Sequence, residues 1–198
     1  APLIAAIAAV TIASLALLIA GDNPLNAFRE MWKTIDSTES VVIILNKAVP
    51  FYVAGVAVAI GFKMNLFNIG ADGQYRLAAL FAAALGAAVD FPAPIHVAFI
   101  LIVAMSVGAL WAAIPGVLKV TRNVNEVIST IMLNYVALSV IQWLFENFFR
   151  DKGAEGLNVK TKLLPASGRM PDIVDDRLGG MFFVALFVVF LYWVLVFK

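Results

Sequence analysis

The chain has 198 residues, of which 63% are hydrophobic and only 14% are charged, and its mean hydropathy is +0.95. Soluble domains carry about a quarter of charged residues, so this composition excludes an ordinary soluble protein and predicts an all-α, polytopic membrane protein. The net charge of +1 argues against a nucleic-acid partner. The absence of cysteine excludes disulfides, thiolate metal sites and a cysteine nucleophile.

The single histidine, His96, stands at the start of an apolar run. A metal site would need more nitrogen, sulfur or oxygen ligands nearby than this neighbourhood offers. We therefore favour a helix-end histidine near the membrane interface over a metal ligand. The chain also lacks the glycine-rich phosphate loop G-x-x-x-x-G-K-[ST].

Six apolar runs predict about six transmembrane helices, because about 20 helical residues cross the hydrocarbon core. The runs are residues 1–20, 41–62, 75–89, 95–118, 127–145 and 178–197. The third is short and must include the turn before it to cross. The sequence begins inside one run and stops directly after another. We therefore expect residues 1–198 to form a single transmembrane domain, incomplete at both ends, of a longer protein.

Several residues predict where these helices end, kink or break. The sequence from Gly21 to Pro24 should end the first helix, and residues 23–40 have the apolar spacing of an amphipathic helix at the interface. Pro50 should kink or break the second helix, and Pro115 with Gly116 should kink the fourth.

A polar segment at residues 63–74 contains Gly70 and Gly73, which favour a tightly turned backbone. Two interpretations stay open. One is a helix connector in which Asp72 suits the start of the next helix. The other is a broken helix near a permeation path, where irregular backbone is tolerated because protein surrounds it.

A second polar segment, residues 119–130, joins two of the longest uncharged runs. It contains no cysteine, no histidine and no glycine-rich phosphate loop, so nothing in it predicts catalysis. We interpret it as a short helix at the membrane surface that another protein touches. Alternatively, it forms one bent helical unit with residues 127–145.

The longest polar segment, residues 150–177, mixes acidic and basic residues and predicts a solvated loop. Alternation of six spans places this loop on the opposite side from residues 63 and 119–130. The short basic turns at Lys63 and at Lys119 and Arg122 favour a cytoplasmic location for that side. The raw count of Lys and Arg favours the reverse orientation.

Two polar motifs and one loop then resemble a known family. Residues Phe67 to Gln74 look like the "FNIGAEGQ" signature of ABC-importer permeases of the ribose, branched-chain amino acid and nucleoside group. Residues Asn125 to Tyr135 are similar to the "GxNEVISTxMLNY" segment of the simple sugar/nucleoside subfamily, and residues 164–171 match a loop of that subfamily. Two departures are Asn123, where Gly is usual, and Asp72, where Glu is usual. Asn tolerates the left-handed backbone better than most residues, so the turn at Asn123 should survive.

The resemblance implies a non-enzymatic, multi-pass permease subunit in the bacterial inner membrane. It would move nucleosides or simple sugars by alternating access.

The implied partners are a second homologous permease (forming a heterodimer), cytoplasmic ATP-binding subunits, an external solute-binding lipoprotein and membrane lipid. No cofactor is implied on this chain, because ATP and Mg would be bound by the ATPase. Residues 119–130 become the cytoplasmic coupling segment, and residues 150–177 become the external loop that faces the binding protein. The residues implied to couple to the ATPase are Arg122, Asn123, Asn125, Glu126, Val127, Ser129 and Thr130.

Polar and aromatic side chains near the expected path are Asn46, Lys47, Phe51, Asn65, Phe67, Asn68 and Gln74. Each could equally serve helix packing. A stand-alone secondary transporter remains an alternative, but it needs a carboxylate in mid-span. Only Glu146 lies close to a span interior, and its spacing to Gln142 and Arg150 predicts a ladder of side-chain bonds instead. A purely structural membrane subunit is the third possibility.

Overall fold

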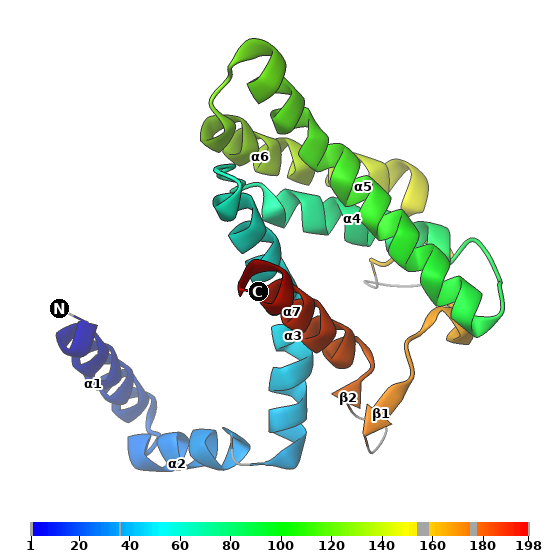
Figure 1. Cartoon of the computed structure of the whole chain (residues 1–198). Coiled ribbons are helices and arrows are strands. Elements are labelled where there is room, and N and C mark those ends of the chain that lie inside the picture. Colours follow the sequence, from blue (N-terminus) through cyan, green and yellow to red (C-terminus); the bar gives the residue numbers. More distant parts are fainter. Residues whose placement is uncertain (1, 36, 154–158, 175–177, 198) are drawn as a thin grey trace. The chain divides into compact units, whose positions relative to one another are not determined.

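The structure, a computed structural model, describes the chain except residues 1, 36, 154–158, 175–177 and 198. The chain divides into two compact units, Ala1–Ala48 and Val49–Lys198, which are described separately (Figure 1). The described residues are mainly helical, which confirms the predicted all-α class, and they add only two short strands. Residues 154–158 and 175–177 of the predicted external loop lie outside the described residues.

The first unit contains α1 (Pro2–Ala20) and α2 (Pro24–Ile35). Gly21 has a φ of +87° and ends α1, with its N–H donating to the Leu18 carbonyl at 3.1 Å. A left-handed glycine is the common way to close a helix. The Asn23 side chain then accepts from the Leu25 N–H at 2.9 Å and caps α2. The predicted stop after residue 20 and the predicted helix within residues 23–40 are both confirmed.

Helix α3 (Thr38–Lys63) begins in the first unit and continues into the second. It runs through Pro50 as one helix, so a break at this proline is wrong. The irregular backbone comes instead at residues 64–70, between α3 and the next helix.

Four elements form the packed part of the second unit: α4 (Ala71–Gly86), α5 (Ala93–Arg122), α6 (Glu126–Leu144) and the π-helical turn η1 (Phe145–Phe149). Helix α4 lies against both α5 and α6 (Figure 1). Leu77, Ala78 and Ala137 are buried. At one end of α4, a Cβ on Gly86 would lie only 2.9 Å from Ile100 Cγ1, so a small residue permits the close approach of α5.

The chain after α6 returns to the end of the unit where α4 meets the start of α5. Arg150 pairs with Thr161 in an isolated antiparallel bridge, and the turn η2 (Ala166–Gly168) contacts α5. The strands β1 (Asp172–Val174) and β2 (Leu178–Gly179) pair antiparallel, and α7 (Met181–Phe197) follows. The predicted loop therefore contains short ordered elements.

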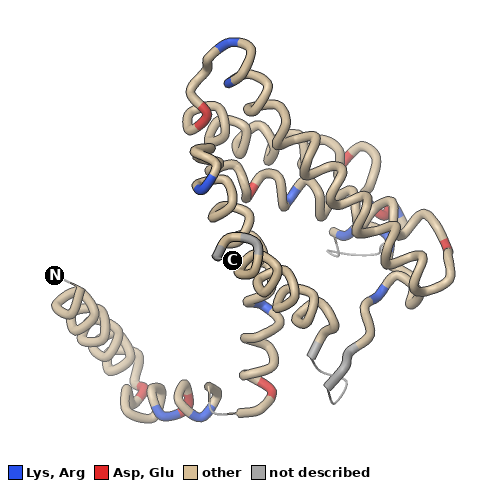
Figure 2. The backbone as a smooth tube through the Cα atoms, viewed as in Figure 1, with Lys and Arg blue, Asp and Glu red and all other residues tan. Residues whose placement is uncertain are grey.

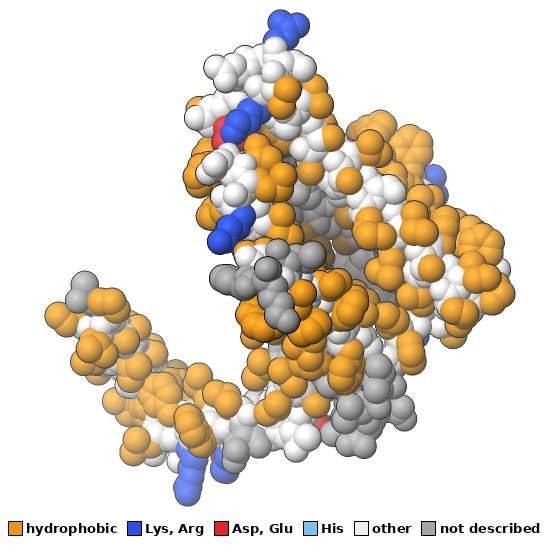
Figure 3. Space-filling view, in the orientation of Figure 1, with side chains coloured by type: hydrophobic (Ala, Val, Ile, Leu, Met, Phe, Trp, Pro, Cys, Tyr) orange, Lys and Arg blue, Asp and Glu red, His pale blue; other side chains and the backbone are white. Residues whose placement is uncertain are grey.

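Among the described residues, four helical segments are long and apolar enough to cross a membrane: α1, α3, α5, and α6 together with η1. The third and sixth predicted spans correspond to α4 and α7, which are shorter, at 16 and 17 residues. Helix α4 starts four residues before the third apolar run. This agrees with the prediction that the short run must include the turn before it. Charged residues lie mainly near helix ends and in loops (Figure 2). Hydrophobic side chains cover much of the visible surface (Figure 3), as expected for contact with lipid.

Candidate functional site

Two helices of the second unit end at a left-handed asparagine. Asn65 follows α3 with a φ of 54°, and Asn123 follows α5 with a φ of 52°. Asparagine adopts this backbone more readily than other residues with a Cβ. The prediction that Asn123 can replace glycine in the turn is confirmed. Both turns redirect the chain within a few residues, and the ends of α3 and α5 lie near the start of α6.

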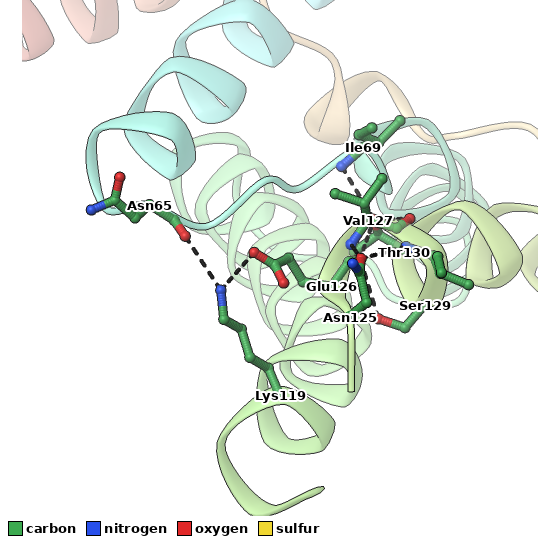
Figure 4. A network of polar contacts seen from close by, with 9 residues as sticks. Asn65, Ile69, Lys119, Asn125, Glu126, Val127, Ser129 and Thr130 are labelled. Carbon is green, nitrogen blue, oxygen red and sulfur yellow. Dashed lines mark hydrogen bonds and ion pairs between the residues drawn. The ribbon is translucent and has the colours of Figure 1, made fainter. Parts of the chain in front are cut away.

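Lys119 joins these three chain segments. Its Nζ donates to the Asn65 carbonyl at 3.3 Å and pairs with Glu126 Oε1 at 2.5 Å (Figure 4). The Lys119 and Glu126 side chains are only 31% and 18% exposed. The negative charge of Glu126 also stands in the first turn of α6, where the helix dipole favours it. We call this arrangement of Lys119, Glu126 and Asn65 the lysine bridge.

Residues 119–130 do not form one short helix, so that interpretation of the segment is wrong. Helix α5 continues through Arg122, residues 123–125 form the turn, and α6 begins at Glu126. The Asn125 side chain caps α6 by accepting from the N–H groups of Val127 and Ile128 at 2.9 and 3.2 Å. The alternative of one bent helix is also wrong, because a left-handed residue separates the two helices.

The two sequence motifs contact each other directly. The Ile69 N–H donates to Thr130 Oγ1 at 3.3 Å, and the Ile69 carbonyl accepts from Asn134 Nδ2 at 3.0 Å. The Gly73 N–H donates to Asn134 Oδ1 at 2.9 Å. A Cβ on Gly70 would lie 3.1 Å from Thr130 Cβ, so glycine allows this approach. Thr130 and Asn134 therefore satisfy backbone groups at the start of α4, and the two motifs form one structural unit.

Asn68 and Gln74 use their side-chain amides on each other. Asn68 Nδ2 donates to Gln74 Oε1, and Gln74 Nε2 donates to Asn68 Oδ1, both at 3.1 Å. Asn68 Oδ1 also accepts from the Gly70 N–H at 2.9 Å. These amides stabilise the irregular backbone before α4, so polar contacts within the chain already occupy them.

A cavity of about 250 Å³ lies beside the lysine bridge. Its walls come from the end of α3, the connector at Phe67 and Asn68, the Pro115–Gly116 region of α5, and the start of α6. Among the described residues, no group of three metal-ligating side chains exists in the chain. The lysine bridge holds the ends of α3 and α5 at the start of α6.

The predicted coupling residues divide by exposure. Arg122, Asn123 and Asn125 are exposed on the turn between α5 and α6, whereas Glu126 and Val127 are partly buried. Ser129 and Thr130 are buried, and both hydroxyls donate to the Glu126 carbonyl, at 3.2 and 2.7 Å. The predicted coupling residues that a partner protein could touch are thus those at the end of α5 and in the turn. Ser129 and Thr130 instead stabilise the first turn of α6.

Four of the predicted path residues lie close together in the second unit. Asn65, Phe67, Asn68 and Gln74 gather around the lysine bridge and the amide pair. Phe51 lies on α3 with 78% of its surface exposed. Asn46 and Lys47 belong to the first unit. The ladder predicted at Glu146 is confirmed, since its carboxylate accepts from Arg150 Nη1 at 2.9 Å and from Gln142 Nε2 at 3.4 Å.

No local pattern predicted the contacts of His96 at the other end of α5. The ring is in the first turn of α5, as predicted, but it is fully buried. Its Nε2–H donates to the Gly86 carbonyl and its Nδ1 lies beside Ser167 Oγ, both at 2.9 Å. Ser167 Oγ is also 3.2 Å from Asp90 Oδ1. His96 and Ser167 are 71 positions apart, so no short sequence motif links them. We call His96, Ser167 and Asp90 the loop anchor.

Comparison with known proteins extends these observations to a family. Residues 40–198 match the family described as the permease component of branched-chain amino acid transport systems. The chain is 33% identical to the guanosine ABC transporter permease protein of Bacillus subtilis, with 100% of the chain and 57% of that protein covered. It is 31% identical to the glucose ABC transporter permease protein of Haloferax volcanii, with 94% of the chain and 52% of that protein covered.

The nucleoside ABC transporter permease protein of Lactococcus lactis is 28% identical, with 84% of the chain and 46% of that protein covered. The chain thus spans about half the length of these curated relatives. No solved structure matches it. The family match covers both motifs that meet at the start of α6, and it confirms the resemblance to sugar and nucleoside permeases. The chain therefore belongs to the permease-component family of branched-chain amino acid transport systems.

Proposed function

We propose that this chain is part of an inner-membrane permease subunit of an ATP-driven importer for nucleosides or simple sugars. The observation that carries the proposal is the contact between the two motifs, which fixes an exposed turn at the end of α5. The names of the relatives, for guanosine, glucose and nucleosides, support this solute class. The subunit itself would hydrolyse nothing. ATP and Mg would be bound by partner subunits.

The coupling surface in this proposal is the last residues of α5 together with the turn that follows it, residues 120–125. Arg122, Asn123 and Asn125 are exposed there, and the lysine bridge with the buried Thr130 ties the turn to α3, α4 and α6. A push on this turn by an ATP-binding subunit would therefore reach three helices at once. Opposite it, the loop held by the loop anchor would face a solute-binding lipoprotein. A second homologous permease would complete the pore.

Arg122 offers the sharpest test of the coupling surface, because its side chain is exposed and stands outside the lysine bridge. We expect Arg122→Glu, in the full-length permease within the assembled importer, to abolish ATP-driven uptake while membrane levels stay normal. Arg122→Lys keeps the charge and is the matched control. Uptake by Arg122→Glu equal to that of the control would remove the coupling assignment. Uptake that continues without the ATP-binding subunits would indicate a secondary transporter instead.

Glu126 needs a separate design because its carboxylate pairs with Lys119 inside the chain. Charge reversal by Glu126→Lys should impair uptake, as should added bulk at Asn125, which also removes the cap of α6. The double swap Lys119→Glu with Glu126→Lys restores the pair in reverse. Recovery of uptake in the swap would place Glu126 in the internal bridge. Continued loss would place it in contact with the partner.

A further inference from the structure

Helix α6 and the turn η1 that continues it carry a row of polar side chains on the face that points away from α4 and α5. Tyr135, Ser139, Gln142 and Glu146 follow one another at spacings of four, three and four residues, which puts them on one side of a helix. All four are exposed, Tyr135 by 70%. We call them the α6 stripe. The stripe includes Tyr135, the last residue of the second motif. Tyr135 takes no part in the contacts between the two motifs at the start of α4.

The packed side of α6 lies opposite this stripe. Thr130 and Ala137 are buried at 2% and 0% exposure, and α6 contacts α4 and α5. With about 100° per residue, Ala137 stands roughly 200° from Tyr135 around the helix axis. The stripe therefore is not directed into the packed core of this unit.

The position of the stripe along α6 makes a lipid contact costly. Tyr135 stands about 14 Å and Gln142 about 24 Å along the axis from Glu126, within a hydrocarbon core of about 30 Å. Polar groups at such depth face protein or a water-filled cavity rather than lipid. Glu146 and Arg150 are near the far end, where they can also reach the interface.

Two residues of the stripe, Tyr135 and Ser139, have few partners within the described chain. Ser139 Oγ makes only a long contact of 3.4 Å to the Tyr135 carbonyl, and no contact of the Tyr135 hydroxyl appears among the described residues. Glu146 accepts from Arg150 Nη1 at 2.9 Å and from Gln142 Nε2 at 3.4 Å, one bond to each carboxylate oxygen, and each oxygen keeps a further lone pair. Asn68 and Gln74, by contrast, already satisfy each other. Glu146 lies within the π-helical turn η1, which follows α6 directly, and such turns are frequent at functional sites.

We propose that the α6 stripe lines the solute path and binds the sugar ring of the transported molecule. Two hydroxyls, an amide and a carboxylate offer both donors and acceptors, which suits a neutral ring with several hydroxyl groups. The Tyr135 ring adds a flat apolar surface against which such a ring can stack. A free sugar and the ribose of a nucleoside share this chemistry. This inference rests on the proposed transport function and assigns its solute-contacting residues.

Introduced cysteines test the stripe, because residues 1–198 contain no cysteine. In the full-length permease of the assembled importer, with any cysteine outside this range replaced, Tyr135→Cys, Ser139→Cys and Gln142→Cys are exposed to a charged, membrane-impermeant thiosulfonate. We expect all three to react, and guanosine or glucose to slow the reaction severalfold. The matched control is Val136→Cys, which is also exposed, at 47%, but stands about 100° round the helix.

The reagent results decide between the possible surroundings of the stripe. Reaction at the three stripe positions and not at Val136→Cys supports a water-lined path. Protection by guanosine or by glucose tells which solute occupies it. Labelling only by a lipid-soluble maleimide, or equal labelling of the control, overturns the inference and indicates lipid or protein packing. ATP-driven uptake by the wild-type importer is measured in parallel. If uptake is intact but the labelling contradicts the stripe, only the assignment of the stripe fails and the proposed transport function stands.

Removing single polar groups gives a second readout. Tyr135→Phe and Gln142→Leu should each raise the KM of uptake roughly 2- to 12-fold, the worth of one hydrogen bond, with little change in the maximal rate. Unchanged KM values in both variants would contradict solute contact.

Discussion

The contact between the two motifs can be tested at Gly73, where α4 and α6 approach most closely. A Cβ on this residue would lie 2.8 Å from Asn134 Oδ1, 3.0 Å from Ala137 Cβ and 3.1 Å from Asn134 Cα. The last two atoms cannot rotate away, because they are fixed to the backbone of α6. Gly73→Ala should therefore push the helices apart.

The size of the effect follows from three terms. Overpacking of a tight contact costs about 1–3 kcal/mol, and loss of the Gly73 N–H bond to Asn134 costs about 1 kcal/mol. Alanine gains roughly 0.5–1 kcal/mol over glycine within a helix. We expect a net loss of about 1–3 kcal/mol in the free energy of unfolding.

Gly116→Ala is the matched control, since nothing lies within 4 Å of a Cβ there, and it should be neutral or slightly stabilising. Both variants of the purified full-length permease would be unfolded by heat or denaturant in detergent, alongside Gly73→Ala combined with Asn134→Ala. The double variant should lose less than the sum of its parts, because the nearest clashing atom is removed. A Gly73→Ala protein as stable as the Gly116→Ala protein would refute the close contact.

Two further predictions concern the loop anchor and the turn after α5. His96→Ala should leave buried polar groups unpaired at a cost of about 1–3 kcal/mol, so trypsin added from outside should cut at Lys160 or Lys162 roughly 5- to 140-fold faster, and Ser167→Ala should have a smaller effect. Asn123→Gly should keep full stability, whereas Asn123→Val should lose about 1–2 kcal/mol in denaturation, because a β-branched residue resists the left-handed backbone. Unchanged cleavage, or equal stability of the two Asn123 variants, would contradict these contacts.

Signals that act over a few residues were sufficient to predict much of the fold. The apolar runs correctly located α1, α3, α5 and α6, because hydrophobic length decides which segments can cross a membrane. The tolerance of asparagine for the left-handed region correctly predicted the turn at Asn123. The i, i+4 spacing of Glu146 with Gln142 and Arg150 correctly predicted their side-chain bonds.

Contacts between distant residues could not be predicted. Lys119 reads as a solvated basic residue in the sequence, although it pairs with Glu126 and reaches the Asn65 carbonyl 54 residues away. Ser129 and Thr130 read as part of an exposed polar segment, but α6 turns them inward. Partner choice depends on which helix faces pack together, and no periodicity within either helix encodes that choice.

The long-range contacts also set an order of assembly. The backbone groups of Ile69 and Gly73 bond to side chains of α6 that are synthesised 61 and 65 residues later. The partner of His96, Ser167, is synthesised 71 residues later. During synthesis, α4 and α5 therefore enter the membrane before either end of their bundle can close. Until α6 has been made, the start of α4 must keep its unpaired N–H groups in water or against another protein.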